Sequence, residues 1–363
     1  WQHRGGGALW KFDGLFHVDK TLIEATDVMD PSVRMLDMSR IGPVLTGEDA
    51  VVSKGPPVTA MLIQNTNPVA VAPDSNRVRQ GFNRDDLFVC VHEQFMTETA
   101  RHADIVLPAT MFLEHDDIYT AGGQPFLELG TKVIEAPEGC VSNHELSRAL
   151  AHRLGAHHPG FEMTDTELLD ATLKRSGYPG YQAMRAQPFL DIATDFRHLH
   201  FLDGFATPSG KFRFAAPWAD LGAAGAGIEP FPDHVDLIDR ATEERPYRLV
   251  TAPARNYLNT SFTETPGSLK REGRPEAMIH PDTLARLGLS AGDRVRLGNE
   301  RGEVVVHARS FDGVQPGTVI VESVHPGHAF EGGMGINALT SADSPPPSGG
   351  AVFHDTSIWM RPA

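Results

Sequence analysis

The chain of 363 residues is long enough for two or three domains with substantial cores. Its net charge of −15 argues against a nucleic acid or an anionic membrane as the main partner, and no apolar run is long enough to span a bilayer. Two cysteines, Cys90 and Cys140, are too few for a disulfide framework or an iron–sulfur cluster.

Residues 1–56 carry no regular pattern beyond one short helix signal. The sequence opens at Trp1, without a methionine or a signal peptide. We therefore interpret residues 1–56 as the irregular remnant of a missing N-terminal part.

Residues 57–240 begin with the pattern of an α/β domain. Apolar runs predict buried strands, and polar segments between them predict short helices, in the order 58–64 (strand), 73–82 (helix), 86–92 (strand), 97–102 (helix) and 103–108 (strand). Strands that are apolar throughout indicate a parallel sheet covered on both faces. A further helix over 142–155 begins with the capping box Ser142–Glu145 and ends at Gly155.

Residues 245–363 carry β signals. Strands are predicted at 247–252, 294–299, 303–310 and 318–324, and one helix interrupts them at 280–293. The segment "NERG" predicts a tight connection between the second and third strands. Closing so many short strands in so few residues favours a compact barrel.

The stretch "TETARHADIVLPATMFLEHDD" is rich in acidic residues and histidines, which raises the question of a metal site. His102 and Asp104 are only two residues apart, and residues 114–117 are consecutive, so neither set has the spacing of a zinc or EF-hand site. The chain also contains no protease nucleophile elbow, P-loop or G-x-G-x-x-G segment. We therefore expect this stretch to be scaffold.

The carboxyl ends of the predicted parallel strands favour a ligand site. Ligands of open α/β sheets bind at that edge, and the segments there are dense in amide, hydroxyl and carboxylate groups: 64–68, 92–99 and 108–117. Such groups suit a base or a ribose. The alternative is that Asn67, Thr97 and Asp104 are only caps and turn residues.

Two blocks of the sequence resemble one known family. "MLIQNTNPVAVAPDSNRVRQGFNRDDLFVCVHEQFMTETARHADIVLPATMFLEHDDIYTAGG" is similar to the nucleotide-binding region of the molybdopterin oxidoreductases, the dimethyl-sulfoxide-reductase and formate-dehydrogenase superfamily. "RLVTAPARNYLNTSFTE", "IHPDTLARLGLSAGDRVRLGNERGEVVVHA", "VQPGTVIVESVHP" and "GINALTSADSPPPSGGAVFHDTSIWM" resemble its C-terminal molybdopterin-dinucleotide-binding barrel. The resemblance covers residues 57–160 and 247–363.

The resemblance implies a fold, a cofactor and a set of binding residues. The fold is α/β, with a partial, doubly wound, mainly parallel sheet followed by a double-psi-like β-barrel. The cofactor is a bis(molybdopterin guanine dinucleotide) that holds molybdenum or tungsten. The cofactor-binding residues that it implies are Asn65, Asn67, Glu93, Thr97, Thr251, Arg255, Asn259, Ser261 and Asn337. His325, after a barrel strand, could either face the cofactor or lie in a surface loop.

The chain departs from the family pattern in two places. The segment "GGQPFLELG" replaces one in which the family often carries Arg and Gln. The part that would hold the metal ligand, and a [4Fe–4S] cluster where one is present, precedes this chain. We therefore assign no catalytic residue and no metal ligand here.

The function implied by the resemblance is that of the C-terminal part of a molybdenum or tungsten oxidoreductase. This part would orient the cofactor for two-electron chemistry on a small substrate, with formate as the first candidate. The alternative is a non-catalytic module that binds a guanine nucleotide, a pterin or a partner subunit. Expected partners are the missing N-terminal half, a small-molecule substrate and an electron-transfer subunit, with no nucleic acid and no membrane segment. We expect a cytoplasmic location, or a periplasmic one if the upstream part carries an export signal.

Overall fold

The computed structural model describes residues 16–49, 52–193, 195–215, 217–225, 227–231, 239–345, 350–354 and 356–363. The chain divides into two units, each built from two separate stretches. One consists of Trp1–Val33 and Pro108–Ala215, and the other of Arg34–Leu107 and Ala216–Ala363. This division differs from the ranges predicted along the chain, because residues after 215 fold with Arg34–Leu107 rather than with the segment that precedes them.

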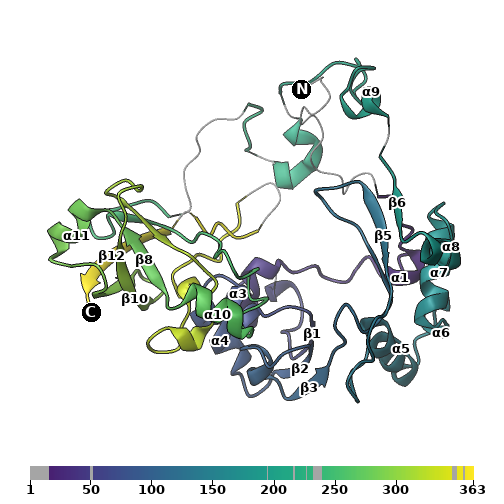
Figure 1. Ribbon diagram of the computed structural model, residues 1–363, viewed down its shortest axis with the longest axis horizontal. Helices are drawn as coiled ribbons and strands as arrows, with labels where there is room; N and C mark the ends of the chain where they lie inside the picture. The colour runs from purple at the N-terminus through teal and green to yellow at the C-terminus, as the bar shows by residue number, and fades with distance from the viewer. Residues whose placement is uncertain are drawn as a thin grey trace. The chain divides into compact units, whose positions relative to one another are not determined.

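The first half of the Arg34–Leu107 and Ala216–Ala363 unit is an α/β layer (Figure 1). Its elements are η2 (Met38–Arg40), α2 (Ile41–Leu45), η3 (Val52–Lys54), β1 (Ala60–Gln64), α3 (Pro68–Val71), α4 (Ser75–Phe82), β2 (Phe88–Glu93), η4 (Ala100–His102) and β3 (Ile105–Pro108). The sheet order is β1-β2-β3, and β1 pairs with β2 in parallel from Ala60↔Phe88 to Gln64↔His92. These strands confirm the prediction of a parallel sheet.

Helices cover one face of this sheet. Ile63, Val89 and Val91 point to that face and pack with Val78 and Phe82 of α4 in one core cluster. On the other face Leu62, Phe88 and Ile105 remain 46%, 47% and 45% exposed. Within this unit, the helices that pack on the sheet therefore lie on one face, and the predicted cover of the second face does not come from this unit's own helices.

Helices α2 and α4 cross without space for an extra methyl group. A Cβ added at Gly81 would lie 2.4 Å from the Cβ of Leu45, whose side chain is only 2% exposed. We expect Gly81→Ala to lower the free energy of unfolding by about 1–3 kcal/mol, because overpacking outweighs the better helix propensity of alanine. A Cβ added at Gly267, in another helix of the same unit, would meet no atom within 4 Å. Gly267→Ala should therefore raise the free energy of unfolding. Urea unfolding of both variants tests this, and equal shifts would contradict it.

The second half of this unit is a closed six-stranded barrel. Its elements are η5 (Trp218–Gly225), β7 (Tyr247–Val250), α10 (Pro266–Glu272), β8 (Glu276–Ile279), α11 (Pro281–Leu287), β9 (Arg294–Gly298), β10 (Glu303–Ser310), β11 (Thr318–Val321), η6 (Gly327–Ala329), η7 (Ile336–Ala338) and β12 (Thr356–Pro362). The order around the barrel is β10-β8-β11-β7-β12-β9, which confirms the predicted barrel. Strands β8 and β12 were not predicted. The "NERG" segment closes the antiparallel β9–β10 pair as expected.

The other unit contains an antiparallel sheet and a group of helices. Its elements are α1 (Thr21–Glu24), β4 (Asp117–Tyr119), β5 (Phe126–Gly130), α5 (Asn143–Leu154), α6 (Pro159–Glu162), α7 (Asp165–Arg175), α8 (Tyr181–Ala186), β6 (Phe189–Asp191) and α9 (Phe196–Leu199). The sheet order is β4-β5-β6. The predicted capping box of α5 is present, and Thr164 and Glu167 form a second one on α7. In the described residues no helix has both the length and the apolar character to cross a membrane.

Candidate functional site

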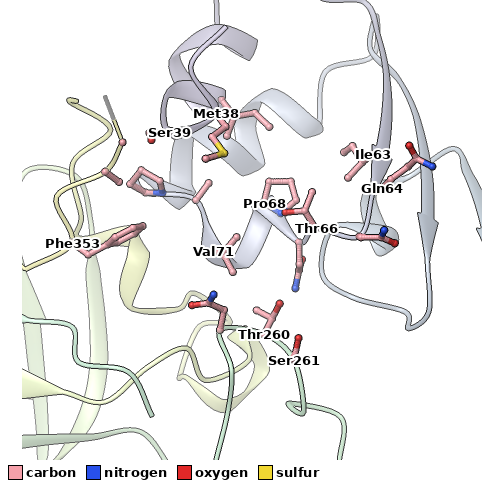
Figure 2. Close-up of a pocket in the computed structure, with 18 of the residues that line it drawn as sticks. Met38, Ser39, Ile63, Gln64, Thr66, Pro68, Val71, Thr260, Ser261 and Phe353 are labelled. Carbon is pink, nitrogen blue, oxygen red and sulfur yellow. The ribbon is translucent and has the colours of Figure 1, made fainter. Parts of the chain in front are cut away.

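A cavity of about 850 Å³ lies where β1 ends, between the α/β layer and the barrel of the same unit. One wall is the segment from Met61 to Pro73, and the opposite wall is the barrel loop Leu258–Ser261 with Phe353. In Figure 2 the side chains of Thr66 and Val71 face Thr260 and Ser261 across this space. The cavity therefore sits at the carboxyl edge of the parallel sheet, where the strand-end rule places a ligand.

Two asparagines shape the opposite walls of this cavity through their backbones. Asn65 follows the last residue of β1 with φ of 52°, and Asn259 in the barrel loop has φ of 51°. Asparagine adopts this left-handed region more readily than other non-glycine residues. Pro68 then begins α3 at a position where the missing amide hydrogen costs nothing.

The lining of the cavity is neutral and rich in hydrogen-bonding groups. Its polar members are Ser39, Gln64, Asn65, Thr66, Asn67, Asn259, Thr260 and Ser261. None of the described lining residues is an aspartate or a glutamate. A phosphate-bearing ligand would therefore find hydroxyl and amide donors there without repulsion from carboxylates.

A second cavity of about 220 Å³ adjoins the first, since Val71, Asn259 and Phe353 line both. Of the residues predicted to bind the cofactor, Asn65, Asn67, Asn259 and Ser261 line the large cavity. Thr251, Asn259 and Asn337 line the small one. The structure thus brings six of these positions, from two distant parts of the sequence, to two adjoining cavities.

Glu93, Thr97 and Arg255 line neither cavity. Glu93 is 9% exposed and accepts a hydrogen bond from the N–H of Gln94, and burial raises its pKa. The hydroxyl of Thr97 accepts from the N–H of Ala100, so it acts as a turn residue. Arg255 is exposed in the loop before Asn259.

Two of the lining residues are also structural. The Nδ2 of Asn337 donates to the carbonyls of Ala70 (3.0 Å) and Val71 (3.1 Å), which fixes the barrel segment η7 to α3. The Oδ1 of Asn67 accepts from the N–H and hydroxyl of Thr99, and its Nδ2 donates to Glu98 at 2.9 Å. Their side chains hold the walls in place, and the ligand-facing groups are mainly those of the other lining residues.

His325 is buried, at 4% exposure, so it does not lie in a surface loop. Its ring contacts Tyr257 edge-on at 5.4 Å between centroids. Burial lowers the pKa of His325, and its Nδ1 has no hydrogen-bond partner within the described part of the chain. His325 lines neither of the two cavities, although its neighbours Ser323 and Val324 line the small one.

Two polar side chains of the acid- and histidine-rich stretch have structural partners nearby. The Oδ2 of Asp104 accepts from the N–H of Val89 at 2.7 Å, and the Nδ1 of His102 lies 2.9 Å from the Oδ1 of Asn83. Within the described ranges no three His, Cys, Asp or Glu side chains converge to hold a metal ion.

Several contributors to the site had no signal in the sequence. Met38 and Ser39 of η2, from the segment with the short helix signal, line the large cavity, as do Gly350, Ala351 and Phe353 before β12, and neither segment was assigned to the site. Glu98 was also missed, because its role depends on a hydrogen bond from Gly327, which is 229 residues away. Only the Pro- and Gly-rich composition near residue 350 marked that segment as a loop.

The structure combines a parallel α/β layer with a closed barrel, and the large cavity lies between them. Family models agree: "Molybdopterin oxidoreductase" matches residues 34–153, and "Molydopterin dinucleotide binding domain" matches residues 247–357. The chain belongs to the molybdopterin oxidoreductase family, as its sequence had suggested.

Relatives show how much of such a protein this chain represents. It is 31% identical over 367 residues to "Probable oxidoreductase YoaE" of Bacillus subtilis, covering 99% of the chain and 52% of the relative. It is 26% identical over 325 residues to the dimethyl sulfoxide/trimethylamine N-oxide reductase of Rhodobacter capsulatus, covering 80% and 38%. The chain thus spans about half the length, or less, of these relatives. The acetylene hydratase of Pelobacter acetylenicus shares the fold, with a TM-score of 0.72 at 21% identity over 91% of this chain and 47% of that one.

Proposed function

We propose that this chain is the C-terminal, cofactor-holding part of a molybdenum or tungsten oxidoreductase with a bis(molybdopterin guanine dinucleotide) cofactor. The observation that carries the proposal is the pair of adjoining cavities, which are lined by residues of both family-model regions. When bound, such a cofactor supplies two-electron redox chemistry at its metal. A [4Fe–4S] cluster and the residue that ligates the metal would belong to the upstream half.

The residues of this chain would bind and orient the cofactor. Thr66, Thr260 and Ser261 place hydroxyl groups on opposite walls, where they can donate to phosphate or ribose oxygens. Backbones held in the left-handed region at Asn65 and Asn259 fix both walls before the ligand enters. A preformed site lowers the entropy lost on binding.

Ser261→Asp tests the assignment, because it places a carboxylate on a wall that has none. Repulsion of about 1.4 kcal/mol already weakens binding tenfold, so we expect at least a tenfold loss of bound cofactor. The full-length protein should be purified and its metal measured by mass spectrometry, together with the guanine nucleotide released on denaturation. Ser290→Asp, exposed elsewhere in the same unit, is the matched control.

The two readouts separate the alternatives. Stoichiometric metal and guanine nucleotide that both fall in Ser261→Asp support the proposal. Guanine nucleotide without metal or pterin in the unchanged protein would favour the non-catalytic module. A cofactor content that is equal in Ser261→Asp and Ser290→Asp would show that the cavity is not the binding site.

The substrate proposal is formate, oxidised in a two-electron reaction. It is supported by a relative named "F420-dependent formate dehydrogenase 2 subunit alpha" of Methanococcus maripaludis, 26% identical over 288 residues. Reductases of dimethyl sulfoxide and trimethylamine N-oxide are similar at the same level. Two assays of the full-length protein decide between these substrates. One measures reduction of an electron-accepting dye by formate, and the other measures oxidation of a reduced dye by dimethyl sulfoxide or trimethylamine N-oxide.

We further propose that the upstream half of the protein packs on the open face of the β1-β2-β3 sheet. That face exposes the apolar side chains of Leu62, Phe88 and Ile105, whereas parallel sheets are normally covered on both faces. An electron-transfer subunit would then contact the protein elsewhere. Cross-linking of a cysteine placed at Phe88 in the full-length protein should identify upstream residues.

A further inference from the structure

A separate cavity of about 390 Å³ lies in the unit that contains the β4-β5-β6 sheet. Its walls come from α1, the start of β4, the first turn of α5 and one face of α7. Asp165, Leu168, Leu169 and Thr172 line it at the i, i+3, i+4 and i+7 spacing of a single helix face. The size is within the range of small-molecule sites.

Two carboxylates in this cavity have no lysine or arginine partner within the described ranges. Asp117 and Asp165 both line it; Asp165 accepts a hydrogen bond from the hydroxyl of Ser142 at 2.9 Å, and its other oxygen lies 4.0 Å from the Nε2 of His144. Lys20 also lines the cavity, but its ammonium is paired with Glu24 at 2.7 Å. Burial raises the pKa of Asp117 and outweighs the hydrogen bond from the N–H of Ile118 and the charge of His115, which lower it, while the charge of Asp165 raises it further.

A buried hydroxyl in the same cavity also lacks a partner. Thr172 is 1% exposed, lines the cavity, and its Oγ1 makes no hydrogen bond within the described chain. Leaving a buried hydroxyl unpaired is costly, so such a group indicates an interaction that is missing. The two histidines of the lining are already engaged: the Nδ1 of His115 lies 2.8 Å from the hydroxyl of Thr110, and the Nε2 of His144 lies 2.9 Å from the carbonyl of Met163.

We propose that this cavity binds a small organic cation, an aliphatic ammonium group with an alkyl body. The ammonium would pair with Asp117 and Asp165 and donate to the hydroxyl of Thr172. The alkyl body would lie on the apolar wall, which consists of Val18, Ile23, Ile118, Leu168 and Leu169. A bare metal ion fits less well, because no three ligating side chains of the described chain converge here.

Titration calorimetry on the full-length protein with n-hexylammonium tests this proposal. Hexanoate and 1-hexanol carry the same alkyl body with a negative charge or none. The experiment is run at about pH 8, where unperturbed imidazoles are neutral and carboxylates are charged. We expect hexylammonium to bind at least tenfold more tightly than 1-hexanol, and hexanoate not to bind. No binding of hexylammonium at millimolar concentration, or equal binding of all three, would overturn the proposal.

Two isosteric variants locate the binding. Asp117→Asn keeps the oxygen that accepts from the N–H of Ile118, and should weaken hexylammonium binding at least tenfold. Thr172→Val removes the unpaired hydroxyl, and should weaken binding severalfold without lowering the melting temperature. Glu138→Gln, exposed in the same unit, should leave the affinity unchanged. Unchanged affinity in both Asp117→Asn and Thr172→Val would place any binding outside this cavity.

Discussion

Asp239→Ala should lower the free energy of unfolding by about 3–5 kcal/mol, because it removes a buried carboxylate that pairs with Arg301 and leaves the buried donors of Ser357 without their acceptor. Asp239 is 5% exposed, and its carboxylate accepts from Arg301, which belongs to the β9–β10 connection. It also accepts from the N–H of Ser357 at 3.0 Å and from its hydroxyl at 2.8 Å. One carboxylate therefore joins the β9–β10 connection to the start of β12 and helps to close the barrel.

The matched control is Glu300→Gln. Glu300 pairs with Arg301 at 3.0 Å, but its side chain is 55% exposed, so the change should cost less than about 1 kcal/mol. Urea unfolding of both variants, with hydrogen exchange of the β12 amides as a local probe, measures the difference. Equal costs for the two variants would show that the buried network does not hold the barrel closed.

Glu98→Gln should destabilise the unit that contains the large cavity by about 2–3 kcal/mol, because it replaces a charged acceptor of two hydrogen bonds. The Oε2 of Glu98 accepts from Asn67 at 2.9 Å, and its Oε1 accepts from the N–H of Gly327 at 3.0 Å. The amide of glutamine would turn one of these acceptors into a donor that faces another donor. Glu243→Gln, at an exposed position of the same unit, is the control and should change little.

The same variant should change how stability depends on pH. Burial alone would raise the pKa of Glu98, but the hydrogen bonds from Asn67 and Gly327 outweigh burial and lower it. A lowered pKa in the folded state stabilises the protein above the unfolded value of about 4.3, and this stabilisation is lost as pH falls through the folded pKa. The stability difference between wild type and Glu98→Gln should therefore shrink in acid. A difference that stays constant below about pH 4 would contradict this mechanism.

The sequence predicted those parts of the fold that depend on local patterns. The strand at β1, the capping box at Ser142 and the β9–β10 hairpin all follow from residues within about ten positions of each other. Strand β12 was missed because its pairing with β7 and β9 is set by partners far away in sequence. The cover expected on the second face of β1–β3 is not supplied by the helices of this unit, for a related reason. Apolar runs show that a face needs cover, but they do not show which part of a protein supplies it.

The individual binding residues were implied by the family resemblance. Asn65 and Asn259 line the large cavity, and both occupy left-handed backbone positions, which asparagine favours. Glu93 and Thr97, which also lie in a segment marked by the strand-end rule, lie outside both cavities. The rule identifies the edge of a sheet, and the orientation of each side chain at that edge depends on the turn that follows the strand. Whether Glu93, Thr97 and Arg255 contact the cofactor remains a prediction.

The discontinuity of the two units affects how the protein is made. Glu98 cannot meet Gly327 until 229 further residues have been synthesised. At about 5–20 residues per second, synthesis of these residues takes roughly 10–50 s. During this time β1 and β2 are already synthesised but the barrel is not yet complete. The walls of the large cavity at Asn65 and Ser261 come from the same two stretches, so the cavity does not exist on a nascent chain. Any ligand of this cavity must therefore enter after translation of both stretches.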